Sequence, residues 1–394
     1  MSTPDGSRAD RSYLDHAATS PLVAVAREAM LAELDRVGNA SSLHASGRAA
    51  RRVVEEARES LAASCGCHPT EVIWTSGGTE ADNLFLTGAW AARAPERDRP
   101  QRNRVVVSAV EHPAIMETHA ALARRGADAV TLDVTAEGVA QVALLPGLLT
   151  VPTAAVSVMW VNNETGVVQP VTTVAEHARA AGAWSHADAV QALGHVPVDF
   201  AGSGLDAASL SAHKVGGPIG VGALLLRRGI ELTPIGFGGG QERDLRSGTL
   251  APALVAGFAA AAGSAVAQRE GEAVRLGELR SRIDALAGRL DGVTVNGAPA
   301  ERSPAISNLT FDGLRADDLL MLLDAAGVDS STGSACTAGV SQPSDVLLAM
   351  GRTVEQASAS LRFSLGHSTT AADIDRLVTV LPDAVARARS AYGR

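Results

Sequence analysis

Seven short runs rich in apolar and β-branched residues alternate with alanine-rich stretches in the first part of this 394-residue chain. The runs are Glu71–Thr75, Arg104–Ser108, Ala129–Leu132, Ala155–Trp160, Trp184–Asp188, Ala207–Ser211 and Gly222–Leu226. Between them lie helical patterns such as Glu80–Ala92, Ala114–Arg125 and Thr173–Ala181. Strand–helix alternation predicts an α/β protein with a mostly parallel, seven-stranded sheet, and strands without polar alternation fit a sheet covered by helices on both faces.

The pattern changes after about residue 250. A long segment rich in Ala, Arg and Glu, Ala251–Leu290, predicts one or two helices, and it precedes two short strand patterns and two further helical ones. These are Val293–Val295 and Ile306–Thr310, then Ala316–Ala326 and Thr370–Tyr392. We expect a disordered leader at 1–12, a large domain at 13–262 and a smaller α+β domain at 263–394. The N-terminal segment is a candidate to pack with the smaller domain.

Charge and hydropathy exclude several classes of protein. The net charge is −9 and the basic residues are scattered, which disfavours direct nucleic-acid binding, because that needs clustered positive charge. No apolar run reaches the roughly 18 to 20 residues of a membrane helix, and the N-terminus has no apolar signal segment. Three cysteines do not make a disulfide framework in a chain this long, so we expect free thiols and a cytoplasmic location.

One lysine stands among small residues directly after a predicted strand. In the run Ser211–Gly217, Lys214 is set where desolvation lowers the pKa of an ammonium, so that the amine can attack a carbonyl. Ser211 and His213 beside it offer donors to an anion such as a phosphate. An ordinary surface position is the alternative for this run alone.

Further polar residues follow other predicted strands. Asp188 can hold a positive charge on a heteroaromatic ring nitrogen, and Gln191 could bond an oxygen of the same ring. The turn with Gly78 and Thr79 joins a strand to a helix, where backbone N–H groups bind anions. The alternative in both places is a plain helix N-cap.

His112 and Asn163 also follow predicted strands. A histidine there could lie over a planar cofactor and move protons, since it titrates near neutral pH, although a structural histidine is the alternative. Because α/β sheets bind ligands at the carboxyl ends of their strands, these loops should converge.

Two residues of the second half complete the candidate site. Cys336 lies among small, flexible residues, which favours an exposed nucleophile over a buried structural thiol. Arg362 could clamp a carboxylate with two parallel hydrogen bonds. The polar stretch from Gly238 to Thr249 precedes the long helix, and a simple surface loop is its alternative explanation.

Taken together, these motifs resemble a known family, the cysteine desulfurases of the IscS/NifS type. These are fold-type I pyridoxal-phosphate enzymes of the class V aminotransferase family. The resemblance runs in order from about residue 13 to 390. It rests on the segments Tyr13–Thr19, Gly38–Ser42, Gly78–Thr79, Ser211–Lys214, Arg246–Thr249 and Ser334–Thr337.

The resemblance implies a role for each candidate residue. Lys214 would hold pyridoxal 5'-phosphate covalently, Asp188 would pair with its ring nitrogen, and His112 would stack on the ring. The remaining cofactor-binding residues would be Gly78, Thr79, Asn163, Gln191, Ser211 and His213, with Thr249 reaching in from the second subunit of a homodimer. Asn39 and Arg362 would bind the substrate. Cys336 would take the sulfur.

The implied reaction converts L-cysteine to L-alanine and leaves a persulfide on Cys336, which an acceptor or scaffold protein removes. A selenocysteine lyase and another aminotransferase or lyase are the nearest alternatives, and a non-catalytic scaffold is disfavoured because Lys214, Asp188 and Cys336 are all present. Two departures, Val215 and the run Gly366–Ser368, bear on the sub-type alone. The acceptor is left open between iron–sulfur cluster assembly, tRNA thiolation, DNA sulfur modification and a thio-metabolite.

Overall fold

The computed structural model describes residues 11–93, 102–333, 336–337 and 340–391. A seven-stranded sheet forms the larger part of the molecule, in the order β2-β8-β7-β6-β5-β3-β4. Its strands are β2 (Val72–Thr75), β3 (Arg104–Ser108), β4 (Asp128–Leu132), β5 (Thr153–Ser157), β6 (Trp184–Asp188), β7 (Ala207–Ser211) and β8 (Gly222–Leu226). Only the pairs that β8 makes with β2 and β7 are antiparallel among these strands. The predicted mostly parallel, seven-stranded sheet is confirmed.

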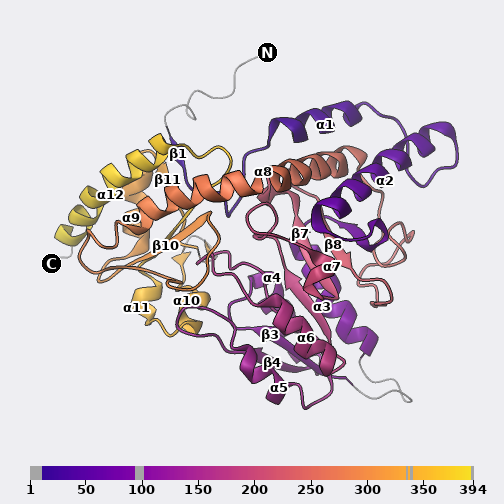
Figure 1. The fold of residues 1–394 in the computed structure, drawn as a ribbon, viewed down its shortest axis with the longest axis horizontal. Coiled ribbons are helices and arrows are strands. Elements are labelled where there is room, and N and C mark those ends of the chain that lie inside the picture. Colours follow the sequence, from indigo (N-terminus) through magenta and orange to yellow (C-terminus); the bar gives the residue numbers. More distant parts are fainter. Residues whose placement is uncertain (1–10, 94–101, 334–335, 338–339, 392–394) are drawn as a thin grey trace.

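Helices cover both faces of this sheet (Figure 1), and most of its strands are therefore buried on both sides. On one face Trp74 and Leu225 pack with α2 and with the first half of α8, and on the other Ile73 and Leu224 pack with α3 and α4. The helices of this part are α1 (Ala24–Leu34), α2 (Ala45–Cys65), α3 (Gly78–Arg93), α4 (Pro113–Arg124), α5 (Leu145–Leu148), α6 (Val171–Ala180), α7 (Phe200–Ser203) and α8 (Pro252–Asp284). Short 3₁₀ turns lie at Pro69–Glu71, Val142–Leu144 and Ala212–Lys214.

A second, smaller layer of strands and helices follows α8. Its sheet has the order β14-β10-β9, and β1 pairs with β11 beside it. The strands are β1 (Ser12–Tyr13), β9 (Val293–Val295), β10 (Ile306–Phe311), β11 (Val328–Asp329), β12 (Cys336–Thr337), β13 (Val340–Ser341) and β14 (Ser360–Ser364). The helices are α9 (Ala316–Ala325), α10 (Asp345–Ala349), α11 (Val354–Ala357) and α12 (Ala371–Ala391).

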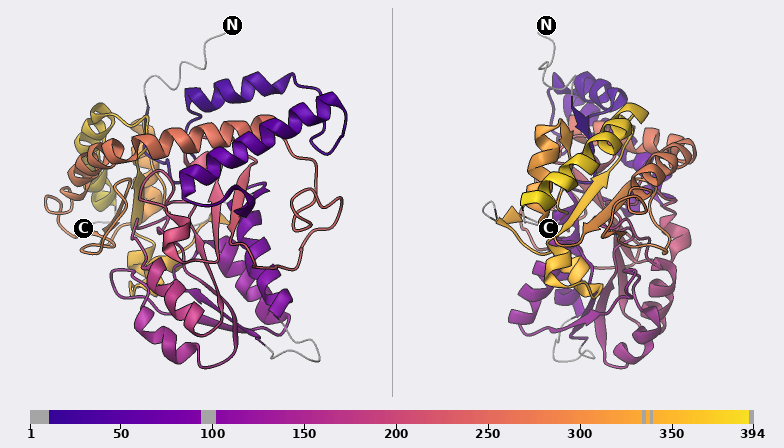
Figure 2. Two further views of the ribbon diagram at one scale, coloured as in Figure 1. Left: turned by 45° about the vertical axis from the view of Figure 1, so that its right-hand side comes forward. Right: turned by 90° about the vertical axis from the view of Figure 1, so that its left-hand side faces the viewer.

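The long helix α8 joins the two parts, as Figure 1 and the left view of Figure 2 show. Its residues up to Ala262 belong to the core of the large sheet, whereas Leu276, Leu279 and Ile283 belong to the core under the small one. The segment Ala251–Leu290 therefore forms one continuous helix of 33 residues rather than two. The expected domain boundary at 262/263 falls inside this helix and stays a prediction.

The N-terminal segment crosses from one part to the other. Ser12 pairs with Val328 of the small layer and is buried, so the ordered chain includes a residue that we expected in the leader. The first ten residues of that expected leader lie outside the described residues. Further along, the backbone N–H of Ser20 bonds the carbonyl of His213, and that of Val23 bonds the carbonyl of Gly216. The segment thereby lies against the turn that carries Lys214.

Candidate active site

A cavity of about 420 Å³ opens where β5, β6 and β7 end, between the large sheet and the small layer. Ten of the thirteen residues proposed from the sequence line it. They are Gly78, Thr79, His112, Asn163, Asp188, Gln191, Ser211, His213, Lys214 and Arg362. The carboxyl ends of parallel strands bring these residues together, as the strand–helix pattern predicts.

Lys214 lies in the turn after β7. Its Nζ donates to the carbonyl oxygens of Ala17 at 2.6 Å and Ala18 at 3.0 Å. Burial lowers the pKa of Lys214 to about 8, the positive charge of Arg362 adds to that effect, and the carboxylate of Asp188 opposes it. An amine with this pKa is unprotonated in a useful fraction of molecules near neutral pH, which a nucleophile or proton carrier needs.

Asp188 ends β6 and is buried at the bottom of the cavity. Its Oδ1 accepts a hydrogen bond of 2.9 Å from the backbone N–H of Val190. Burial raises the pKa of Asp188, while His112, the Val190 N–H and Lys214 each oppose the rise. The side chain therefore serves both as the cap of its own turn and as an acid that faces the cavity.

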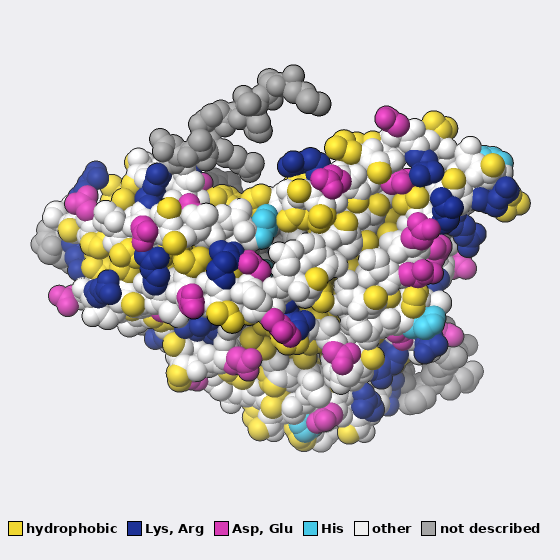
Figure 3. All heavy atoms as spheres, turned by 45° about the horizontal axis from the view of Figure 1, so that its top comes forward, with side chains coloured by type: hydrophobic (Ala, Val, Ile, Leu, Met, Phe, Trp, Pro, Cys, Tyr) yellow, Lys and Arg dark blue, Asp and Glu magenta, His cyan; other side chains and the backbone are white. Residues whose placement is uncertain are grey.

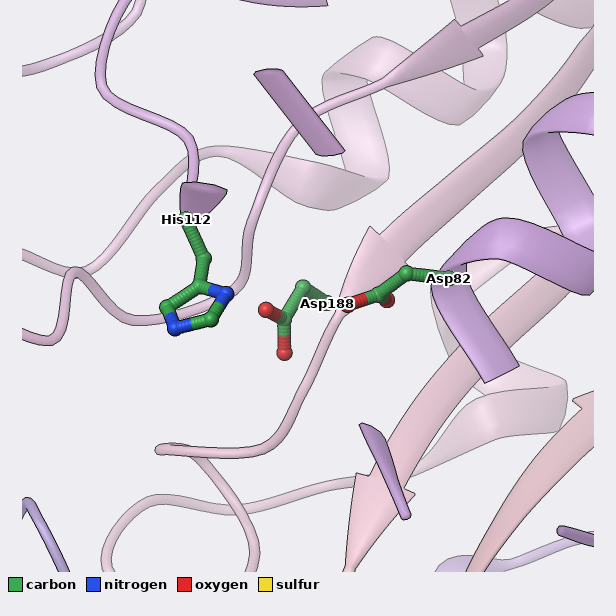
Figure 4. Close-up of side chains that lie close together, drawn as sticks. All are labelled: Asp82, His112 and Asp188. Carbon is green, nitrogen blue, oxygen red and sulfur yellow. The ribbon is translucent and has the colours of Figure 1, made fainter. Parts of the chain in front are cut away.

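His112 is the N-cap of α4, and its Nδ1 accepts from the backbone N–H of Ala114 at 3.1 Å. This bond fixes the ring and leaves the proton of the neutral form on Nε2. Burial lowers the pKa of His112, with the carboxylate of Asp188 opposing. Figure 4 shows His112 and Asp188 facing each other across the cavity, with Asp82 beside Asp188.

The same cavity also has donors suited to an anion. Gly78 opens α3, and a Cβ on it would come within 2.7 Å of Cγ2 of Val190, so only glycine fits this turn. Thr79, Ser211 and His213 add polar side chains there. The start of a 16-residue helix favours negative charge at this position.

Arg362 extends from β14 of the small layer into the cavity and is buried. Its two terminal nitrogens donate to Oδ1 of Asp15 at 2.8 Å and to the carbonyl of Asn163 at 2.9 Å. Its Nε is buried and has no acceptor among the described residues. That N–H is left without a protein acceptor among the described residues, in a residue that lines the cavity.

Sequence reasoning missed several residues that line the cavity. The carbonyls of Ala17 and Ala18 carry no side-chain signal, so nothing in the sequence could have pointed to them. Asp82 had a signal, because it is an acid on the apolar face of a predicted helix. Glu164 directly follows Asn163 in the sequence; burial raises its pKa, and it accepts a hydrogen bond of 2.5 Å from the hydroxyl of Ser344.

Three predicted residues are not placed in this cavity. Asn39 lies exposed between α1 and α2, where its Oδ1 accepts from the backbone N–H of Ser41 at 2.9 Å. Thr249 lies exposed after the loop that follows β8, and its predicted role is in the second subunit. The backbone of Cys336 belongs to β12, which pairs with β13, but its side chain lies outside the described residues. Their roles stay predictions.

Comparison with known proteins defines the class. The family model described as aminotransferase class-V matches residues 12–377, and the chain belongs to this family. The match confirms the predicted fold class. Members of this family are enzymes that use pyridoxal phosphate, so the prediction of an enzyme is confirmed as well.

Within that family the similarity is to cysteine desulfurases of the IscS/NifS type, as the sequence motifs predicted. An IscS-like cysteine desulfurase of Mycobacterium tuberculosis is 49% identical over 96% of this chain and 98% of its own length. The solved structure of a NifS-like protein has a TM-score of 0.87 at 31% identity, over 96% of this chain and 100% of that one. DndA from Streptomyces lividans has a TM-score of 0.74 at 41% identity, over 89% and 99%.

Proposed function

We propose that this protein is a cysteine desulfurase that binds pyridoxal 5'-phosphate, converts L-cysteine to L-alanine and passes the sulfur through Cys336 to an acceptor protein. The observation that carries the proposal is the position of Lys214. Its amine, with a pKa lowered to about 8, lies in one cavity with a buried carboxylate, Asp188, and a buried guanidinium, Arg362. The names of the similar proteins support the same reaction.

The cavity fits the cofactor in size and in chemistry. Its volume of about 420 Å³ is within the range of small-molecule sites. The turn at Gly78 and Thr79, the buried acid Asp188 and the amine of Lys214 all line it. These three features suit a phosphate, a ring nitrogen and an aldehyde carbon, respectively. Asn163 lines the same cavity, and its Oδ1 is buried without a donor among the described residues.

When bound, the cofactor supplies an electron sink for the bonds around the substrate's α-carbon. The chain's own residues do the rest. Asp188 would hold a negative charge against the ring nitrogen, Arg362 would bind the substrate carboxylate, and His112 would pack against the ring. Lys214, with its lowered pKa, takes the α-proton and holds it until it is returned.

Cys336 completes the reaction as the sulfur acceptor. Its thiolate attacks the substrate's sulfur, so that an S–S bond forms as the C–S bond breaks. The electron pair of the broken bond stays on the substrate carbon, which takes up a proton to give alanine. The thiols of Cys65 and Cys67 are poor nucleophiles, because burial raises the pKa of both, that of Cys67 to about 12.

The test compares Cys336→Ala with Cys67→Ala. We expect both variants to keep the absorbance of the bound cofactor. Cys336→Ala should lose sulfide release and alanine formation from L-cysteine, whereas Cys67→Ala should keep both. Full activity of Cys336→Ala would overturn the assignment of this cysteine, and loss of cofactor absorbance in both would point to a folding defect instead.

We also propose a homodimer in which Thr249 completes the partner's site. Thr249 lies after a loop that exposes Phe237, which is 88% accessible, and Ile219 nearby in sequence is 75% accessible. Where exposed apolar side chains gather into one patch, they are typical of surfaces that bind another protein. Mixing Lys214→Ala with Thr249→Ala subunits should restore activity, because one site of the hybrid has both residues. No restoration, with hybrids shown to form, would contradict the proposal.

The location and the acceptor follow from weaker signals. Among the described helices, none is long and apolar enough to span a bilayer. We propose a cytoplasmic enzyme, because Cys65 and Cys67 are free thiols. We propose that the acceptor is a protein of iron–sulfur assembly or of a thio-modification pathway, and trapping the Cys336 persulfide in a pull-down would identify it.

A further inference from the structure

A line of buried polar side chains crosses the sheet beneath the cavity, on the face that α3 covers. Ser157 of β5, His186 of β6 and Ser209 of β7 are fully buried. Nδ1 of His186 lies 2.8 Å from Oγ of Ser157, and Nε2 lies 2.9 Å from Oγ of Ser209. Ser209 also hydrogen-bonds Asp82 of α3. The result is a hydrogen-bonded chain of four side chains that ends on a carboxyl group.

That carboxyl group lies next to Asp188. Asp82, Asp188 and His112 have side-chain nitrogen or oxygen atoms within 4.8 Å of one another (Figure 4). Asp82 is 1% exposed and Asp188 is 6% exposed. Two carboxyl groups this close in a site with little water do not both ionise readily, since each charge repels the other. The pair therefore retains a proton at neutral pH.

The hydrogen-bond donors show which member keeps that proton. Asp188 accepts the N–H of Val190, and Lys214 faces it as an opposite charge. Oδ1 of Asp82 is buried and has no donor among the described residues. Its closest ring nitrogen, Nε2 of His186, is 3.7 Å away. The protein therefore stabilises an ionised carboxylate at Asp188 more than one at Asp82.

Burial and the neighbouring acids raise the pKa of Asp82, and only the hydrogen bond with Ser209 opposes this rise, when the hydroxyl is the donor. Burial lowers the pKa of His186 to about 3, so the imidazole carries no charge. Its ring stacks on that of Phe85, with the two ring centroids 4.6 Å apart. Glu111 adds a second nearby acid, and its own pKa is raised to about 8 by burial. Among the described residues, no cation lowers the pKa of Asp82 by stabilising its negative charge.

We propose that Asp82 is a positioning residue: it stays a neutral carboxylic acid that donates its O–H to Ser209, so that the single negative charge of the pair rests on Asp188. All the hydrogen bonds in this series then point in one direction. Ser209 donates to Nε2 of His186, and the Nδ1–H of His186 donates to Ser157. The inference rests on the proposed function, because the charge on Asp188 is useful only against a cofactor's ring nitrogen.

The infrared difference spectrum of the holoenzyme tests the state of Asp82 directly. Wild type minus Asp82→Asn at pH 7 should contain the C=O band of a protonated carboxylic acid. Absence of the band from this difference spectrum would overturn the proposal, since Asp82 would then carry no proton.

A second variant keeps the proposal testable if Asp82→Asn does not fold. Ser209→Ala removes the acceptor of the proposed O–H, so the acid band should move to higher frequency; an unmoved band would contradict the proposed bond. The visible absorbance of the bound cofactor is a further readout. We expect Asp82→Asn to leave it unchanged and Asp188→Asn to shift it, and equal shifts in both would overturn the neutral assignment.

These readouts separate this inference from the proposed function. They need a bound cofactor but no turnover and no Cys336. A cofactor-binding protein that forms no persulfide would fail the test of the proposed function and could still show the acid band. An active desulfurase without the band would refute only the role of Asp82.

Discussion

Replacing Gly78 with alanine tests whether the turn before α3 has room only for glycine. A Cβ at this position would lie 2.7 Å from Cγ2 of Val190, and 3.7 Å from Cβ of Ser211. Val190 is β-branched and stiff, so it cannot turn its methyl group away freely. Its backbone N–H also bonds Asp188, so moving Val190 disturbs both the anion end and the ring-nitrogen end of the cavity.

The expected effect is a loss of cofactor affinity. Overpacking of this kind costs about 1–3 kcal/mol. The cofactor-free protein can relieve the strain by moving Val190, but bound cofactor requires the original geometry, so the cost appears in binding. At about 1.4 kcal/mol per tenfold change, the dissociation constant should rise by about 5- to 150-fold. Titration of the apoprotein with pyridoxal phosphate, followed by absorbance, measures it.

Gly271→Ala provides the matched control. Gly271 is exposed in α8, and a Cβ there would meet no atom within 4 Å. Alanine in a helix is favoured over glycine by about 1 kcal/mol, so this variant should be slightly more stable and bind the cofactor as wild type does. The reasoning is refuted if Gly78→Ala binds the cofactor as tightly as Gly271→Ala.

Three further predictions concern charged groups. Arg362→Lys loses the planar fork, so KM for L-cysteine should rise by about tenfold or more in steady-state assays, and an unchanged KM would exclude its carboxylate role. Burial depresses the pKa of Lys214, so its amine in the apoprotein should be modified by an aldehyde reagent with a midpoint near pH 8, and no plateau below pH 10 would contradict this. Arg58→Ala breaks a buried pair with Glu242 at 2.7 Å and should cost about 3–5 kcal/mol in denaturant unfolding, whereas the exposed Arg52→Ala should change little.

Most of the large sheet could be predicted because its strands are short, apolar and separated by clear helices. All seven runs form strands, but the bounds of the fourth, Ala155–Trp160, were misplaced, since β5 covers Thr153–Ser157. The backbone N–H groups of Val158 and Trp160 still bond the carbonyls of His186 and Asp188 in β6, so the chain stays extended beyond the strand. Apolar character alone could not distinguish these residues from the paired ones.

The site was predictable where side chains follow strands and not where the contact is formed by backbone or across the fold. Asp188 and Lys214 follow predicted strands, and parallel topology brings them together. The carbonyl of Ala17, by contrast, reaches Lys214 only because the N-terminal segment crosses from the small layer. The surface in Figure 3 shows a similar limit: apolar side chains gather on the face that carries α1 and α8, and no sequence pattern indicated them as a surface. Val25, Leu31 and Leu34 of α1 are among its exposed residues.

The central claim is that Lys214 carries the cofactor in this cavity. Reduction of the holoenzyme with borohydride, followed by peptide mapping with mass spectrometry, tests it most directly. We expect the cofactor's mass on the peptide with Lys214, and no such adduct in Lys214→Ala. An adduct on any other residue of the wild-type protein, or none at all while the cofactor's absorbance is present, would contradict it.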